Sequence, residues 1–258
     1  MRSWLSLVLM LALLCRSFLA GAAEKASERE LLISAAISLK PVLTELSTLY
    51  AKQKGAIPLR FNYAASGVLQ RQIAEGAPVD IFLAAGEEPM KELGDRLESG
   101  WERVWLRNAL VLAIPRQDQE LRAIDELRQP RFKRIAMGDP QTVPAGLYAQ
   151  DVLVKSKLEG DLKNKIVYAH NVRQVVTYLE QGAIQAGFVY ATDLLGNDAI
   201  KVGWNIAADE HRAIVYPAAI LKRTAWRDDA KRFLSFLENA ESLKTFARFG
   251  FKVEAPGA

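Results

Sequence analysis

A regular alternation of apolar runs and helical patterns is the feature that most limits what this chain can fold into. The apolar run at 31–37 precedes a segment at 39–54 whose apolar residues recur at helical spacing, and the same order returns twice before residue 100. A short apolar run at 109–114 ends at Pro115, and the alternation then restarts and continues to residue 190. Strands that alternate with helices favour parallel sheets with helices on both faces. We therefore predict an α/β fold with doubly wound sheets.

The turn after the expected strand at 134–137 has the character of an anion site. Gly138-Asp139-Pro140 is a turn signal, because glycine relaxes φ and proline fixes it. Pro144 then stands where a helix can begin, and Ala145 and Gly146 carry so little side chain that a ligand could approach the free N–H groups of the first turn. Such a helix end binds anions readily. An ordinary strand-turn-helix connection would look the same.

Three other corners have a similar character, and in doubly wound sheets ligands bind beyond the carboxyl ends of the strands. Ser38 and Ser66 each follow an expected strand at an N-cap position, and Asn171 precedes the helical pattern that starts at Val172. Tyr190 ends the expected strand at 186–190 and adds a phenol. Each residue has a plain alternative, because serine and asparagine cap helices and tyrosine borders cores. Only convergence of the corners would favour a common ligand.

Residues 1–22 have the pattern of a secretory signal peptide. Arg2 precedes an apolar stretch that is too short to span a membrane, and small residues at 20–22 form a cleavage pattern. Cys15 is the only cysteine of the 258 residues and lies in this leader, where its neighbours Leu14 and Arg16 argue against a lipid anchor. The mature chain would have no cysteine and hence no disulfide. We expect a periplasmic protein.

Composition gives no argument for nucleic-acid binding, metal binding or catalysis. The formal charge is +4, and it falls to +2 once the two arginines of the leader are removed. No basic cluster is present, so we expect no nucleic-acid partner. His170 and His211 are the only histidines and lack metal-ligand spacing, while Ser38 and Ser66 have no base that the sequence identifies. We expect no enzyme activity and no cofactor.

Several short motifs occur in order along the chain: AAISL at 35–39, ASG at 65–67, GAPVDIF at 76–82, GDP at 138–140, VPAG at 143–146, GFVY at 187–190 and RFGF at 248–251. Together they resemble the periplasmic molybdate-binding proteins of ABC transporters, and the similarity runs over about 31–253. The chain departs from the family pattern at Ile37, where a small residue is expected, and at His170-Asn171, where acidic residues are common.

The resemblance implies two α/β lobes joined by crossing hinge strands at 109–114 and 213–221. Lobe I would contain 31–108 and 222–258, and lobe II would contain 109–221. The resemblance also implies that an inner-membrane ABC permease receives the ligand, and we expect a monomer. The implied ligand contacts are the hydroxyls and N–H groups of Ser38 and Ser66, the N–H groups of Ala145 and Val172, and the hydroxyl of Tyr190.

The residue types at these five positions suit a tetrahedral dianion such as molybdate, and also tungstate. None is Lys or Arg, so helix ends and hydrogen-bond donors must hold the charge. None is a carboxylate that could accept the proton of monohydrogen phosphate, so the site should reject phosphate. The alternative is a binding protein for sulfate or for a small organic acid, which Arg71 or Arg173 would favour if either faced the cleft.

Overall fold

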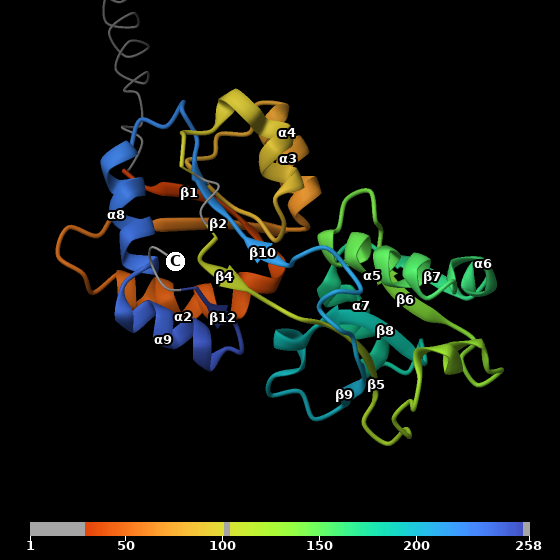
Figure 1. Cartoon of the computed structure of the whole chain (residues 1–258). Helices are drawn as coiled ribbons and strands as arrows, with labels where there is room; N and C mark the ends of the chain where they lie inside the picture. Colours follow the sequence, from red (N-terminus) through yellow and green to blue (C-terminus); the bar gives the residue numbers. More distant parts are fainter. Residues whose placement is uncertain (1–28, 101–103, 255–258) are drawn as a thin grey trace, which may run out of the picture. The chain divides into compact units, whose positions relative to one another are not determined.

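The computed structural model describes residues 29–100 and 104–254, in which two α/β lobes each have a central sheet (Figure 1). The first sheet has the strand order β11-β3-β1-β2. Its first three strands in sequence are parallel to one another, and β11 pairs with β3 in the antiparallel sense. The bounds are β1 Leu31–Ala36, β2 Leu59–Ala64, β3 Ile81–Leu83 and β11 Ala218–Ile220.

The lobe that contains the first sheet also contains two groups of helices (Figure 1). Helices α2, α8 and α9 contact one another, and α3 contacts α4. A short 3-10 turn, η1, connects β1 to α2, and another, η2, follows α4. The bounds are η1 Ile37–Leu39, α2 Lys40–Tyr50, α3 Ser66–Ala74, α4 Glu88–Leu93, η2 Gly94–Arg96, α8 Arg227–Leu237 and α9 Ala240–Arg248.

The second sheet has five strands in the order β7-β6-β8-β5-β9. Strands β7, β6 and β8 are parallel, whereas β5 pairs in the antiparallel sense with both β8 and β9. The strands are β5 Leu110–Pro115, β6 Ile135–Gly138, β7 Ile166–Ala169, β8 Ala186–Tyr190 and β9 Ile200–Asn205. The helices are η3 Ile124–Arg128, α5 Pro144–Lys155, α6 Glu159–Leu162, α7 Val172–Glu180 and η4 Ala191–Leu194.

A small antiparallel sheet in the order β10-β4-β12 lies where the chain passes between the two larger sheets. Strand β4 (Leu106–Arg107) directly precedes β5, and β10 (Val215–Tyr216) directly precedes β11. These two segments pair with each other, and β12 (Lys252–Val253) pairs with β4 from the other side. The chain therefore crosses between the sheets at two adjacent places.

The structure bears out the two-lobe α/β prediction and corrects some of its details. The strand expected at 213–221 is two short strands in different sheets, because Pro217 lies between them and has no N–H to give to a ladder. Strands β5, β9 and β11 are not parallel to their neighbours, since the crossing segments bring β5 and β11 in from the opposite direction. The lobe boundaries given above stay a prediction.

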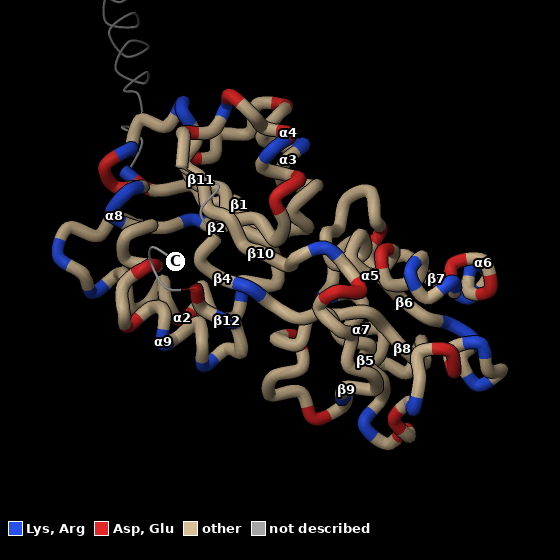
Figure 2. Tube along the Cα trace, in the orientation of Figure 1, with Lys and Arg blue, Asp and Glu red and all other residues tan. Residues whose placement is uncertain are grey.

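One large cluster of buried apolar side chains contains residues of both larger sheets, and a smaller cluster lies around α3 and α4. In the part of the chain that the structure describes, no helix has the length and apolar content to cross a membrane. Basic and acidic residues are interspersed along the described chain in both lobes (Figure 2). The leader at 1–22, with Cys15, lies outside the described residues.

Candidate functional site

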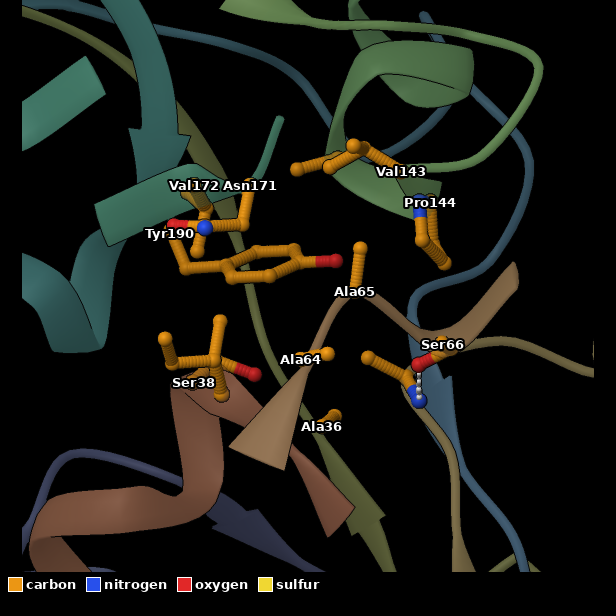
Figure 3. A pocket seen from close by; sticks show the side chains of 13 residues that line it. Ala36, Ser38, Ala64, Ala65, Ser66, Val143, Pro144, Asn171, Val172 and Tyr190 are labelled. Carbon is orange, nitrogen blue, oxygen red and sulfur yellow. Dashed lines mark hydrogen bonds between the residues drawn. The ribbon is translucent and has the colours of Figure 1, made fainter. Parts of the chain in front are cut away.

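A cavity lies where strands of both larger sheets end (Figure 3). One side, which we call the serine wall, is formed by residues at or just after the ends of β1, β2 and β3. The other side, the helix-end wall, is formed by residues at the starts of α5 and α7, which follow β6 and β7, and by the last residue of β8. The serine wall consists of Ala36, Ile37, Ser38, Ala64, Ala65, Ser66 and Ala85, and the helix-end wall of Val143, Pro144, Ala145, Asn171, Val172 and Tyr190.

The structure brings all five predicted contact residues to this one cavity. Ser38 and Ser66 lie in the serine wall, and Ala145, Val172 and Tyr190 lie in the helix-end wall. All five are nearly inaccessible to solvent, with at most 5% of the residue exposed. The corners therefore converge as the prediction required, while the role of these residues as ligand contacts stays a prediction.

The serines are not helix caps, which corrects the N-cap interpretation. Ser38 lies inside the 3-10 turn η1, and its hydroxyl is 3.2 Å from the phenol oxygen of Tyr216. Ser66 is the first residue of α3, and its hydroxyl accepts the N–H of Ala85 at 2.9 Å. Because this bond uses the Ser66 oxygen as an acceptor, its hydroxyl hydrogen is left to donate.

Helices α5 and α7 point their N-terminal ends at the cavity. Pro144 is the first residue of α5, as expected, so Ala145 is the second, and Val172 is the first residue of α7. N–H groups at these positions have no partner within the helix. The predicted cap at Asn171 is confirmed, since its side-chain oxygen accepts the N–H of Gln174 at 3.0 Å. Asparagine thus caps α7 through Gln174 and leaves the N–H of Val172 available.

Tyr190 brings a hydroxyl that is buried without a partner. Its side chain extends into the cavity (Figure 3), and its oxygen has no hydrogen bond in the structure. Burial raises the pKa of this phenol well above its ordinary value, so the group remains a donor at any physiological pH. A buried polar group without a partner costs about 1–3 kcal/mol. An acceptor bound in the cavity would remove that cost.

The small residues of the turn at 138–146 serve packing more than ligand access. A Cβ on Gly146 would lie 2.0 Å from the carbonyl oxygen of Gly138, and a Cβ on Gly138 would lie 2.4 Å from a methyl carbon of Val143. Gly146 does not line the cavity. The expectation that Gly146 opens the helix end to a ligand is therefore wrong. Its missing side chain lets the end of β6 approach α5 closely, and this contact sets the direction of the helix end.

None of the residues that line the cavity is charged. Arg71 is exposed, and Arg173 forms an ion pair with Asp193 at 3.4 Å. The Asp193 carboxylate also accepts the N–H of Tyr190 at 3.1 Å, at the start of η4. Burial raises the pKa of Asp193 to about 6, and the nearby Arg173 opposes that shift. Neither arginine faces the cavity, so the feature that would favour an organic acid is not observed there.

The space inside is narrow. The centre of a water-sized sphere can move through about 10 Å³, which is room for about one water molecule. A tetrahedral oxyanion, with four oxygen atoms around its central atom, needs more room than one water molecule. Among the described residues there is no cluster of His, Cys, Asp and Glu that could hold a bare metal ion. The arrangement suits an anion held through its oxygens.

Sequence reasoning missed two features of this site. The alanines that form much of the serine wall carry no chemical signal, although Ala85 follows β3 and so lies at a strand end like the others. Tyr216 and Asn108, which lie behind Ser38, come from the two crossing segments. No local pattern connects residues that are 178 positions apart, as Ser38 and Tyr216 are.

Comparisons with known proteins agree with this geometry. The model of a family described as bacterial extracellular solute-binding protein matches residues 31–252. The chain is 38% identical over 228 residues to YvgL of Bacillus subtilis (strain 168), a proposed ABC transporter substrate-binding lipoprotein, covering 87% of this chain and 86% of that one. It is 30% identical over 260 residues to the molybdate-binding protein ModA of Escherichia coli (strain K12), covering 98% and 99%.

A solved structure extends the comparison. The periplasmic molybdate-binding protein of Azotobacter vinelandii has a TM-score of 0.78 and 26% identity, covering 87% of this chain and 99% of that one. The resemblance to molybdate-binding proteins seen in the sequence is thus confirmed, and the α/β fold agrees with that of its structural neighbour. The chain belongs to the bacterial extracellular solute-binding protein family.

Proposed function

We propose that this protein captures molybdate, and also tungstate, between the serine wall and the helix-end wall and delivers it to an ABC permease in the inner membrane. The observation that carries the proposal is a cavity with no charged residue in its lining, at which five uncharged donors from five strand ends meet. Two relatives with matching chain length, from Escherichia coli and Azotobacter vinelandii, are named as molybdate-binding proteins, which supports the choice of ion.

The donor set explains how a dianion could be held without a basic side chain. Each helix end carries about half a positive charge, and a hydrogen bond to a charged group contributes about 1.5–3 kcal/mol. The hydroxyls of Ser38, Ser66 and Tyr190 and the N–H groups of Ala145 and Val172 together give at least five such donors. We infer that these residues contact the oxyanion, and that binding needs no further cofactor.

The same donors discriminate by protonation state. Monohydrogen phosphate carries a hydrogen that needs an acceptor, and no carboxylate lines the cavity. The site should therefore prefer fully deprotonated oxyanions. Sulfate remains the second candidate, because it has the same charge and geometry and is smaller, and the cavity is narrow.

We further propose that the protein acts as a monomer in the periplasm after removal of the leader at 1–22. The family supports an extracytoplasmic location. A reconstituted permease that transports molybdate only when this protein is added would test delivery.

Isothermal titration against molybdate, tungstate, sulfate and phosphate tests the choice of ligand. We expect tight binding of molybdate and tungstate, weaker binding of sulfate and no detectable heat with phosphate. Molybdate should also raise the melting temperature by mass action. No heat with molybdate together with tight binding of sulfate or phosphate would refute the proposal.

A further inference from the structure

Behind the serine wall, a partly buried series of hydrogen bonds leads to Ser38 from side chains that do not line the cavity. The phenol oxygen of Tyr216 in β10 is 3.2 Å from the hydroxyl oxygen of Ser38 and 3.1 Å from the side-chain nitrogen of Asn108. Tyr216 is fully buried, and neither it nor Asn108 lines the cavity. Of these three hydrogen-bonded side chains, only that of Ser38 lines the cavity.

The direction of these bonds follows from Asn108. Its side-chain oxygen accepts the N–H of Ala109 at 2.9 Å, which fixes the orientation of the amide. Its nitrogen is then the donor, and it reaches both the phenol oxygen of Tyr216 at 3.1 Å and the hydroxyl oxygen of Thr192 at 2.9 Å. An amide nitrogen has two hydrogens and no acceptor capacity, so both contacts run outward from Asn108.

We assign Tyr216 as the donor to Ser38, because this gives its buried hydroxyl hydrogen an acceptor. Burial raises the pKa of this phenol, so the hydroxyl remains protonated at physiological pH. Its oxygen already accepts from Asn108, and the Ser38 oxygen is the other polar atom that it contacts. Ser38 accepts this hydrogen, and its own hydroxyl hydrogen is left to point away from Tyr216, toward the cavity.

We propose that Asn108 and Tyr216 are positioning residues that hold the Ser38 hydroxyl as a donor toward the bound oxyanion. This inference rests on the proposed function of the cavity. The hydroxyl oxygen of Ser66 likewise accepts a hydrogen bond, from the N–H of Ala85. Both serine oxygens are therefore already used as acceptors, and both hydroxyl hydrogens are left to donate to a ligand. The serine wall therefore excludes anions that carry a proton, because the serine oxygens already accept from Tyr216, which lies outside the cavity lining, and from the main chain of Ala85.

The network also connects the two walls. Asn108 lies between β4 and β5, and Tyr216 lies in the other crossing segment. Thr192, which accepts the second hydrogen of Asn108, lies in η4 two residues after Tyr190. A ligand contact at Ser38 is thus bonded, through two side chains, to the turn that carries the phenol of the helix-end wall.

A double-mutant cycle measures whether Tyr216 acts through Ser38. Titration of molybdate would compare wild type, Tyr216→Phe, Ser38→Ala and the double variant, with the unliganded melting temperature of each recorded. Loss of one hydrogen bond is worth about 1 kcal/mol, so Tyr216→Phe should weaken binding about fivefold in the wild-type background. In the Ser38→Ala background the same change should alter affinity less than about twofold.

Discrimination between molybdate and phosphate is a second readout, and it would not change if Tyr216 had only a structural role. Without the phenol donor, the Ser38 oxygen becomes free to accept, so Tyr216→Phe should weaken molybdate binding and make phosphate binding detectable in the same titration. Tyr50→Phe is the matched control, because it removes another buried phenol hydroxyl outside the cavity lining. It should leave both affinities unchanged.

The outcomes separate this inference from the proposed function. If wild type binds molybdate and Tyr216→Phe binds it equally well, the positioning role alone is overturned. The same holds if Tyr216→Phe weakens molybdate binding equally in the wild-type and Ser38→Ala backgrounds. Wild type that binds sulfate in place of molybdate overturns the choice of ligand, and the cycle is then run with sulfate. Wild type that binds no oxyanion overturns both. If Tyr216→Phe does not fold, Asn108→Ala tests the same series of hydrogen bonds by removing the donor to Tyr216. Its effect on molybdate affinity should also be smaller in the Ser38→Ala background.

Discussion

The two walls of the cavity present donors of different origin. In the serine wall the donors are side-chain hydroxyls, and other parts of the chain, Ala85 and Tyr216, hold the serine oxygens. In the helix-end wall two of the donors are main-chain N–H groups, placed by the positions of α5 and α7. Side-chain substitution should therefore act directly on the serine wall, whereas the N–H groups of the helix-end wall respond to changes in backbone packing.

The largest effect is expected where packing sets the helix-end wall. Gly146→Ala puts a Cβ 2.0 Å from the carbonyl oxygen of Gly138, and main-chain atoms on both sides leave little room to adjust. We expect a loss of about 4 kcal/mol or more in the free energy of unfolding, measured by urea denaturation. Gly160→Ala in α6 is the control, because a Cβ there meets nothing within 4 Å, and it should be neutral or slightly stabilising. Equal stability of the two variants would contradict this account of the turn.

The buried carboxyl beside the helix-end wall should make stability depend on pH. The folded-state pKa of Asp193 is raised from 3.8 to about 6 by burial, so the folded protein holds this proton more tightly than the unfolded chain. The contribution of Asp193 is thus most favourable below pH 3.8 and is lost as the pH rises to about 6, a change on the order of 3 kcal/mol. Denaturation of wild type and Asp193→Asn between pH 4 and 7 should show the variant gaining relative stability as the pH rises. A constant difference across that range would contradict the assigned cause.

Substitution in the two walls should have unequal effects on affinity. Ser66→Ala and Ser38→Ala each remove a donor to the anion and should weaken molybdate binding by about 1.5–3 kcal/mol, or roughly ten- to a hundredfold. Val172→Ala leaves the main-chain N–H in place and should change affinity by less than about threefold. Titration of the three variants checks this, and unchanged affinity in the double serine variant would count against the site.

Tyr190→Phe should have opposite effects on stability and binding. Its hydroxyl is buried without a partner, so its removal should stabilise the unliganded protein by about 1 kcal/mol. The same change removes a donor to the ligand and should weaken molybdate binding about tenfold. Melting temperatures with and without molybdate measure both. A variant that is less stable in the unliganded state would indicate that the hydroxyl already has a partner.

The sequence predicted most of the strands and helices because apolar runs and Gly or Pro signals mark them locally. It missed β9, in which Gly203 interrupts the pattern; a Cβ there would lie 2.6 Å from a methyl carbon of Ile114, so the glycine serves close packing of β5 on β9. The convergence of five residues on one cavity could be predicted, because each follows a strand or ends one and the resemblance names them; their role as ligand contacts stays a prediction. Bonds such as Tyr216 to Ser38 could not be, because they depend on how distant segments pack.

The most direct test is a crystal structure of the protein with molybdate, in which anomalous scattering locates the molybdenum. The account predicts one molybdenum peak between the serine wall and the helix-end wall, with oxygens in hydrogen-bond contact with Ser38, Ser66, Ala145, Val172 and Tyr190. A peak outside this cavity, or an anion held by Lys or Arg side chains, would contradict it.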